Sequence, residues 1–400
     1  MRITMVELSP SGGLFQFSFQ LGQHLAKAGH RVELVTGPRP ELESDHPDFD
    51  VRGVLPTWHA DDAAPGSRAL RHLRRGWRAL RHTSALGTVL LDLKRTRPDV
   101  VLWHPLRFSI DSWAVLVARR ISRNTAFGIV LHEPRPLGEQ RASTSFYRAN
   151  PLLTHSLGAA VRRMDVIFVL GDEARDYVAS TWRPRAILRL IPHGDERVFL
   201  PDTDVPPASE AGPRILFFGT WTRHKGIEVL LGAFRRVQER CASAELVVAG
   251  AVGGDVDFSA IAQRAQDPPG VTLLPGYMPM SEVPDLFASA RVVALPYLRA
   301  NQSGVAHLAQ TFARPIVATA VGELSKVVEH GVAGFVVTPG DEAGLANALL
   351  ALLEDPGLAR TMGEAGRRRL ASDASWERVA DEVLAALQTA VRPGGPVAKG

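Results

Sequence analysis

Short apolar runs alternate with longer amphipathic segments through both halves of this 400-residue chain. An apolar run that is bounded by turn residues and followed by a helical pattern is typical of a buried parallel strand. In the first half the expected strands are 2–8, 31–36, 99–103, 127–132, 166–170 and 187–191. In the second half they are 214–218, 245–249, 271–274, 292–295, 316–318 and 335–337. Parallel strands joined by helices predict an α/β fold with a doubly wound sheet in each half.

The length exceeds what one compact core usually holds, so we expect more than one domain. The segment 201–213, PDTDVPPASEAGP, collects proline, small and acidic residues and predicts a linker. We therefore expect Rossmann-like domains over 1–200 and 214–374, facing each other across a cleft at the carboxyl ends of their strands. A helix over 375–391 could pack back on the first domain, and residues 392–400 read as a loose tail.

Composition excludes several classes of protein. The 45% apolar and 22% charged residues are those of an ordinary globular chain, and the single cysteine, Cys241, excludes an intrachain disulfide. The N-terminus passes directly into a polar turn at 11–13 without the apolar core of a signal peptide, so we expect a cytoplasmic protein. The net charge of +4 comes almost wholly from arginine and is not read as a nucleic-acid site.

A basic turn follows the expected strand 214–218. Gly219 breaks the strand, and Arg223, His224 and Lys225 stand just before Gly226 and a helix that begins near residue 227. Free N–H groups and the helix dipole add to this positive charge, so the segment predicts a site for phosphate or diphosphate. The alternative is an ordinary strand-to-helix loop with solvated charges.

Several motifs, taken in their order and spacing, resemble the retaining nucleotide-sugar glycosyltransferases of family 4, which have the two-domain GT-B fold. The first motif is SGGLFQFSFQLGQHLAKAGHRVELVT. The later ones are GTWTRHKG, ELVVAG, VTLLPGYMPMSEVPDLFASARVVALPY and RPIVATAVGELSKVVEHGVAGFVVTPGD. The resemblance covers nearly the whole chain. It implies transfer of a hexosyl group from a nucleoside-diphosphate sugar to a hydroxyl of a sugar, glycan or lipid-linked acceptor, as in cell-surface polysaccharide or glycoconjugate biosynthesis.

The resemblance also implies which residues bind the donor. Gly12 and Gly13 would let the backbone approach the sugar and its diphosphate. Lys225 would neutralise the diphosphate, next to the turn residues Gly219 and Thr220. The family has an arginine where this chain has Thr220, and we expect Arg223 to supply the missing charge. A dinucleotide-binding domain is disfavoured, because the first turn lacks the GxGxxG spacing and the second strand ends without an acidic residue.

A second departure from the family lies between the expected strands 292–295 and 316–318. Two family glutamates are replaced by Ala300 and Leu308, and a lysine, Lys326, stands where the family favours another glutamate. The intervening segment resembles a QSGV variant of the family and comprises Gln302, Ser303, Gly304 and Val305. Its helix N-terminus could hold phosphate oxygens without a charged side chain. The missing acids leave open an inactive GT-B-like protein that only binds nucleotide or glycan.

His132 and Glu133, in GIVLHEP, end an expected strand of the first half. By resemblance to the family's active-site histidine loop, His132 would contact the donor sugar or diphosphate, and Glu133 would orient the acceptor hydroxyl. The alternative for His132 is simple packing with a hydrogen bond to a carbonyl group.

The nucleobase would lie beside the turn that follows the expected strand 271–274. This turn holds Gly276, Tyr277 and Met278, and Tyr277 either stacks on the base or fills the core. No metal or other cofactor is expected, because Asp255 and Asp257 lie in a glycine-rich loop with no strand to direct them.

Residues 68–81, RALRHLRRGWRALR, place six arginines at helical intervals and Leu70, Leu73, Trp77 and Leu80 on another face. This pattern is typical of a helix on an anionic membrane surface, which would associate the protein peripherally with the inner face of the cell membrane. A solvated helix with one face in the core is the alternative. Gly76 argues against one continuous helix.

Overall fold

The computed structural model describes residues 1–57, 68–104, 106–134, 151–201, 204–300 and 302–391, with the backbone alone for 68–75 and residue 151. The chain divides into two compact units. Among the described residues, the first comprises those within 1–134, 151–192 and 376–391, and the second comprises those within 193–375. The division falls at His193, ahead of the linker predicted at 201–213.

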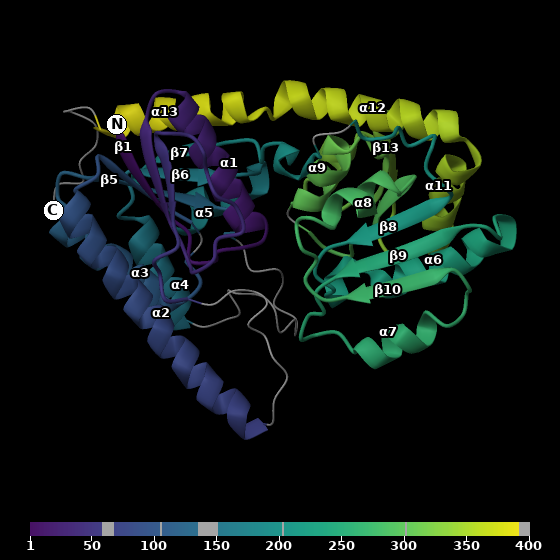
Figure 1. Cartoon of the computed structure of the whole chain (residues 1–400), viewed down its shortest axis with the longest axis horizontal. Coiled ribbons are helices and arrows are strands. Elements are labelled where there is room, and N and C mark those ends of the chain that lie inside the picture. The colour runs from purple at the N-terminus through teal and green to yellow at the C-terminus, as the bar shows by residue number, and fades with distance from the viewer. Residues whose placement is uncertain (58–67, 105, 135–150, 202–203, 301, 392–400) are drawn as a thin grey trace. The chain divides into compact units, whose positions relative to one another are not determined.

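The first unit is built on a parallel sheet that includes β1, β5, β6 and β7 (Figure 1). It has seven strands in the order β3-β2-β1-β4-β5-β6-β7. The strands are β1 (Arg2–Val6), β2 (Arg31–Val35), β3 (Phe49–Arg52), β4 (Val100–Trp103), β5 (Ala126–Leu131), β6 (Val166–Val169) and β7 (Ile187–Leu190). The edge strand β3 was not predicted. Of its four residues only Phe49 is buried, so FDVR lacks the apolar run that marks the other strands.

Helices cover both faces of this first sheet. α1 (Gly13–Lys27) packs against α13 (Trp376–Val391). α2 (Arg68–Thr96), α3 (Ser109–Ile121) and α4 (Pro151–Val161) share a different core, which also includes Trp103 and Phe127 of the sheet. α5 (Asp172–Thr181) joins β6 to β7. α2 is continuous through Gly76, contrary to the break that glycine suggested, and no described helix is long and apolar enough to cross a membrane.

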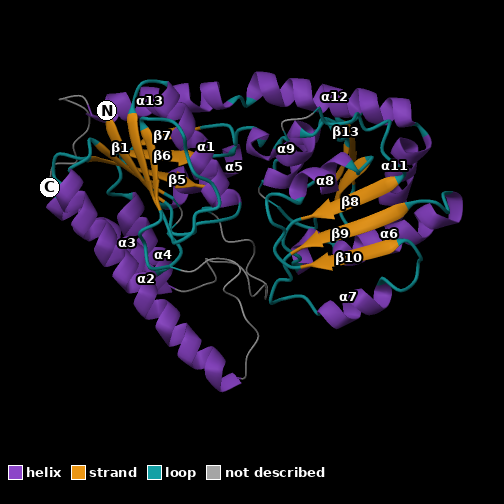
Figure 2. Ribbon diagram, in the orientation of Figure 1, coloured by secondary structure: helices purple, strands orange, loops and turns teal. Residues whose placement is uncertain are grey.

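The second unit has a parallel sheet in which β8, β9 and β10 lie side by side (Figure 2). It has six strands in the order β10-β9-β8-β11-β12-β13. Its strands are β8 (Arg214–Phe218), β9 (Glu245–Gly250), β10 (Val271–Pro275), β11 (Val292–Leu295), β12 (Ile316–Thr319) and β13 (Gly334–Val337). Its helices are α6 (Ile227–Arg240), α7 (Phe258–Arg264), α8 (Val283–Ala288), α9 (Gly304–Thr311), α10 (Leu324–Val328), α11 (Glu342–Glu354) and α12 (Pro356–Asp373). All six predicted strands are present, and the doubly wound α/β fold is confirmed in both units.

The strand order reverses between β1 and β4 in the first sheet and between β8 and β11 in the second. At such a reversal the connections leave toward opposite faces, which opens a crevice outside the carboxyl ends of the two strands. Each unit therefore has one preferred place for a ligand, and the predicted site residues can be located against it.

The predicted linker packs on the second unit. Ala208 and Ala211 are buried, and the carbonyl oxygens of Pro206 and Ala211 accept hydrogen bonds from Arg314 and Arg291. The helix predicted over 375–391 is α13, and it clusters with the first unit. The predicted tail, 392–400, lies outside the described residues.

Candidate functional site

The turn after β8 lies at the point where the strand order of the second sheet reverses. Gly219 has φ 114° and donates its N–H to the carbonyl of Ala249 at 3.0 Å. The buried Trp221 then forms a parallel bridge with Val252. A single 3₁₀ turn, Arg223–Lys225, leads to α6. The predicted order of strand, glycine turn, basic cluster and helix is therefore the one observed.

Gly226 is the residue that lets this turn approach the neighbouring strand β11. Its backbone is left-handed, with φ 69° and ψ 29°, and a Cβ there would lie 2.0 Å from the carbonyl oxygen of Pro296. The N–H of Leu298 donates to the carbonyl of His224 at 2.7 Å. The basic turn and the chain that follows β11 are thus held against each other by backbone contacts.

Lys225 is linked through Tyr297 to the start of α9. Its Nζ lies 3.7 Å from the centre of the Tyr297 ring. The Tyr297 hydroxyl lies 3.2 Å from Oγ of Ser303, the residue just before the helix. Tyr297 is fully buried, so this link is fixed by the core. The structure therefore brings together three predicted parts: the turn glycine, Lys225 and the segment at 303–305, where Val305 faces Gly219.

Arg223 points toward the loop after β9. Its backbone N–H donates to Oδ2 of Asp255 at 3.3 Å, and its Nε donates to the carbonyl of Asp255 at 2.8 Å. Arg223 is exposed, as is Arg299 beyond β11, which was not predicted. The pKa of His224 is lowered to about 4, first by burial and then by Lys225 and Arg299. At neutral pH the imidazole is uncharged, and the positive charge belongs to the lysine and the two arginines.

The N-terminus of α9 is formed as the QSGV segment predicted. Ser303 is buried, and Gln302, Gly304 and Val305 are half-buried. The first N–H groups of a helix have no acceptor within it, so they can bind an anion. Both positions of the missing glutamates are apolar: Ala300 packs against the core and Leu308 lies within it.

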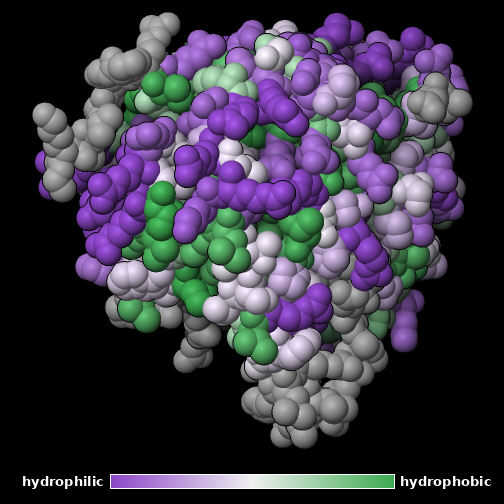
Figure 3. Space-filling view, turned by 60° about the vertical axis from the view of Figure 1, so that its left-hand side comes forward, coloured by the Kyte–Doolittle hydropathy of each residue, from purple (hydrophilic) through white to green (hydrophobic). Residues whose placement is uncertain are grey.

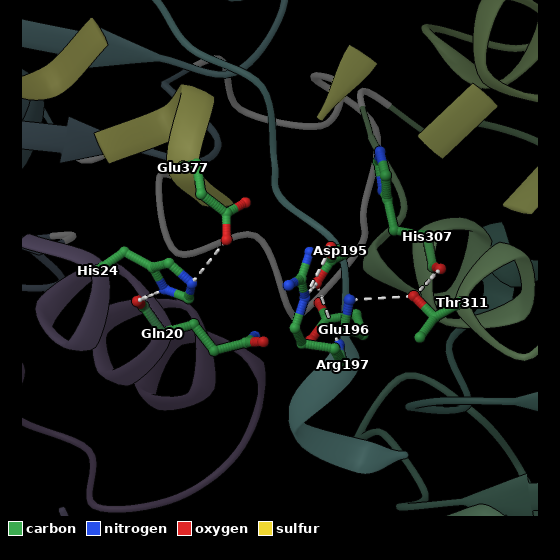
Figure 4. Close-up of polar contacts among 8 residues, drawn as sticks. All are labelled: Gln20, His24, Asp195, Glu196, Arg197, His307, Thr311 and Glu377. Atoms are coloured by element: carbon green, nitrogen blue, oxygen red, sulfur yellow. Dashed lines mark hydrogen bonds and ion pairs between the residues drawn. The ribbon is translucent and has the colours of Figure 1, made fainter. Parts of the chain in front are cut away.

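A histidine pair that the sequence analysis missed supports this helix. The rings of His193 and His307 stack at 4.8 Å and 10°. Nδ1 of His307 lies 3.2 Å from the carbonyl oxygen of Ser303. Oγ1 of Thr311, also on α9, accepts the N–H of Glu196 at 3.0 Å (Figure 4). Burial lowers the pKa of His307 to about 4. The polar cluster HGDE at 193–196, just after the predicted strand 187–191, is the sequence feature from which His193 could have been predicted.

The predicted nucleobase turn follows β10, two strands from β8 on the same edge of the sheet. Gly276 donates its N–H to the carbonyl of Gly250 at 3.0 Å, and Tyr277 and Met278 are half-buried. Among the described residues, no three histidine, cysteine or acidic side chains could hold a metal ion. Asp257 caps α7 by accepting two backbone N–H groups, a structural role for that carboxylate.

In the first unit, Gly12 and Gly13 open α1, and Gly12 has φ 83°. The N–H of Gly12 donates to Oε2 of Glu41 at 3.0 Å, and the same oxygen accepts from Nε2 of Gln16 at 3.0 Å. A carboxylate thus lies where the resemblance implied sugar and diphosphate. Glu41 comes from the chain after β2 and was not predicted, because its sequence context carries no motif.

His132 follows β5 and contacts α1. Its ring lies 4.7 Å from that of Phe17 in an edge-to-face arrangement and 6.4 Å from that of His104. Burial, and secondarily His104, lowers the pKa of His132 to about 3, so the ring is neutral at physiological pH. Glu133, the next residue, is half-buried.

Two buried titratable residues at the reversal of the first sheet were also missed. Glu7 follows β1 and His104 follows β4, and both are at most 3% exposed. Nδ1 of His104 lies 3.0 Å from Oγ of Ser18, whereas its Nε2 and Oε2 of Glu7 have no hydrogen-bond partner among the described residues. Burial raises the pKa of Glu7. A polar residue that closes an apolar strand, as in MVE and LWH, was the available signal.

Two family matches cover most of the chain. Residues 11–194 match the family described as Glycosyltransferase Family 4, and residues 212–355 match Glycosyl transferases group 1. A glycogen synthase of Mycobacterium tuberculosis is 26% identical over 401 residues, which cover 95% of this chain and 92% of the relative. The likeness in sequence therefore extends through both units.

Solved structures show the same fold. A sucrose-phosphate synthase from Thermosynechococcus elongatus superposes with a TM-score of 0.73 at 22% identity, over 97% of this chain and 98% of the other. HepE from Anabaena, solved in complex with UDP-glucose, superposes with a TM-score of 0.69 at 16% identity, over 97% of this chain and 100% of the other.

Proposed function

We propose that this chain, which belongs to the GT-B glycosyltransferases of the family 4 type, moves a hexosyl group from a nucleoside-diphosphate sugar to an acceptor hydroxyl. The transfer retains the configuration of the anomeric carbon. The acceptor class is a sugar, a glycan or a lipid-linked sugar, as in the biosynthesis of cell-surface polysaccharides. Support for the donor class comes from HepE, whose structure holds UDP-glucose, and from starch synthase IV of Arabidopsis thaliana, whose structure holds ADP and acarbose.

One observation carries the donor site: the link from Lys225 through Tyr297 to Ser303 at the start of α9. It connects an ammonium group with the N-terminus of a helix, and both kinds of group bind phosphate oxygens. The neighbouring imidazole of His224 is neutral because its pKa is lowered, so Lys225 faces no second cation at that position. These groups would stabilise the negative charge that develops on the departing diphosphate.

In the proposed reaction, the diphosphate of the donor acts as the base. The acceptor oxygen attacks the anomeric carbon, the bond from that carbon to the diphosphate oxygen breaks, and the acceptor proton passes to the departing diphosphate. Attack on the face from which the diphosphate leaves retains the configuration. This route needs no pair of enzymatic carboxylates, so the absence of the two family glutamates does not forbid it. In this proposal His132, a neutral ring, contacts the donor by hydrogen bonding rather than by charge.

Titration calorimetry with UDP, ADP, GDP and dTDP tests the donor site. We expect one nucleotide to bind best, and Lys225→Met to raise its Kd about 10- to 100-fold, equivalent to the roughly 1.5–3 kcal/mol of a charged hydrogen bond. The matched control is Lys27→Met, an exposed lysine at the end of α1. Equal affinity of the Lys225→Met variant and the native protein would contradict the site.

The alternative of a binding protein without turnover is favoured by the apolar environment of Leu308, which is 4% exposed. Once the nucleotide is known, its sugar conjugates are incubated with candidate acceptors, and the anomeric configuration of any product is read by NMR. Retained configuration supports the proposal, and inverted configuration contradicts the mechanism. Tight binding without product from any acceptor supports the alternative.

A further inference from the structure

Helix α3 exposes a stripe of large apolar side chains on its outer side. Ile110, Trp113, Val117 and Ile121 follow one another at intervals of three and four residues, so they share one face of the helix. They are 39%, 55%, 44% and 45% exposed, respectively. The opposite side of α3 already fills the core through Val115 and Ala118. This apolar stripe is therefore surplus to the packing of the first unit.

Helix α2 continues the same surface. It packs beside α3, and buried residues of both helices line one core on one face of the sheet, so their outer sides face solvent together (Figure 1). α2 exposes Trp77, Leu80 and Leu91 by 61%, 60% and 72%. Figure 3, which brings the left-hand side of Figure 1 forward, shows hydrophobic side chains grouped on this face next to strongly hydrophilic ones. We call the outer side of both helices the α2–α3 surface.

This region of the sequence also has a large excess of positive over negative charge. Residues 68–123 contain thirteen arginines and lysines and three aspartates, whereas the whole chain has a net charge of only +4. Two of those aspartates face inward: Asp92 pairs with Arg52, and Asp111 is fully buried beside His82. Lys94, Arg95, Arg120 and Arg123 are exposed. Arg119 of α3, by contrast, pairs with Asp165. Exposed apolar side chains and exposed cations thus occur together on α2, on α3 and in the turn after α3.

We propose that the α2–α3 surface docks on an anionic lipid bilayer. Monomeric proteins rarely expose many large apolar side chains in one region unless it is an interaction site. Tryptophan prefers the interfacial zone of a bilayer, and arginine and lysine bind the acidic headgroups around it. A second copy of this chain fits less well, because two faces of the same positive charge would repel each other. The proposal does not depend on the glycosyl transfer proposed above.

Co-flotation of the full-length protein with vesicles tests the docking. The vesicles are pure phosphatidylcholine or a mixture with about a third phosphatidylglycerol. We expect binding to the anionic vesicles only, and at least ten-fold weaker binding when the salt is raised from about 0.05 to 0.5 M, because surface charges are then screened. The combined variant Trp113→Ser and Val117→Ser removes the centre of the stripe, and Arg120→Gln with Arg123→Gln removes charge alone. We expect each variant to lower the partition coefficient of the protein onto anionic vesicles at least five-fold.

The controls lie in the second unit. Val332→Ser removes a valine that is 46% exposed, and Arg236→Gln removes an exposed arginine of α6; both should bind like the native protein. The charge variant changes only exposed side chains, so it tests the proposal even if the stripe variant fails to fold. Equal binding to both kinds of vesicle, no binding to either, or unchanged binding of the charge variant would overturn the proposal. Concentration-dependent dimerisation that the stripe variant abolishes would overturn it in favour of a self-interface.

Discussion

Gly226 is the residue whose backbone most restricts the basic turn. Replacement by alanine should destabilise the second unit by about 2–4 kcal/mol, because a left-handed alanine is unfavourable and its Cβ would require the carbonyl of Pro296 to move. We also expect weaker nucleotide binding, since Lys225 is the preceding residue. Urea denaturation and calorimetry measure the two effects. Gly212→Ala is the control, because its Cβ would meet no atom within 4 Å. Equal stability of the two variants would contradict the strain argument.

His307 should make the protein sensitive to mild acid. Its pKa is about 4 in the folded protein and near 6.5 in an unfolded chain, so between these values the unfolded state binds the additional proton. The stability that this residue contributes is therefore complete above about pH 6.5 and is lost as the pH falls toward 4, at up to about 1.4 kcal/mol per pH unit. His307→Gln should flatten the dependence of unfolding free energy on pH between 7 and 5. An unchanged slope would show that His307 does not titrate in this way.

Residues at the site were predictable where they belong to a recognisable motif. They were not predictable where only the fold brings them to the site. Lys225 and Ser303 stand in recognisable segments, and the structure brings them together. Tyr297, which links them, reads as an ordinary apolar position after a strand. Glu7 and His104 come together only because β1 and β4 are neighbours in the sheet, although their strands are almost a hundred residues apart in sequence. A pattern along the chain does not reveal such pairing.

Helix α13 supports the first unit through Trp376. Its ring is fully buried, 5.2 Å from the ring of Phe17 and 6.0 Å from the ring of His24. Nε2 of His24 lies 3.6 Å from a carboxylate oxygen of Glu377, the next residue of α13 (Figure 4). Trp376→Ala should therefore destabilise this unit by about 3–5 kcal/mol through the cavity it leaves. Hydrogen exchange in α1 should accelerate accordingly. Val391→Ala, at the exposed end of the same helix, is the control. Unchanged exchange in α1 would mean that α13 does not stabilise it.

The elements that the sequence predicted best are those buried on both sides. β8, β11 and β12 are apolar except for Arg214 at the start of β8 and Thr319 at the end of β12, and were predicted almost to the residue. β3 was missed because a short edge strand needs only one buried side chain. α2 runs through Gly76, since a glycine costs a helix only about 1 kcal/mol, less than the burial of Ala85, Val89 and Leu93 further along contributes.

At the scale of the whole chain, positive charge is distributed unevenly. The positive excess is concentrated in residues 68–123 of the first unit, whereas the cations proposed for the donor belong to the turn after β8 in the second. A docking surface and a donor site on different units can be altered separately. Variants of the α2–α3 surface should therefore leave nucleotide affinity unchanged.

Hydrogen exchange of the full chain with and without its preferred nucleotide tests the assignment of the donor to the second unit. At a nucleotide concentration about 100-fold above Kd, binding stabilises the native state by about 2.7 kcal/mol. Amides that exchange only when the binding site opens should then exchange about 100-fold more slowly. We expect this protection in residues 219–226 and 303–311 and little change in β1 or α13. Lys225→Met at the same nucleotide concentration should show less protection at both segments, because the ammonium group acts on the ligand that both contact. Protection confined to the first unit would contradict this donor site, since Lys225 and the N-terminus of α9 belong to the second unit.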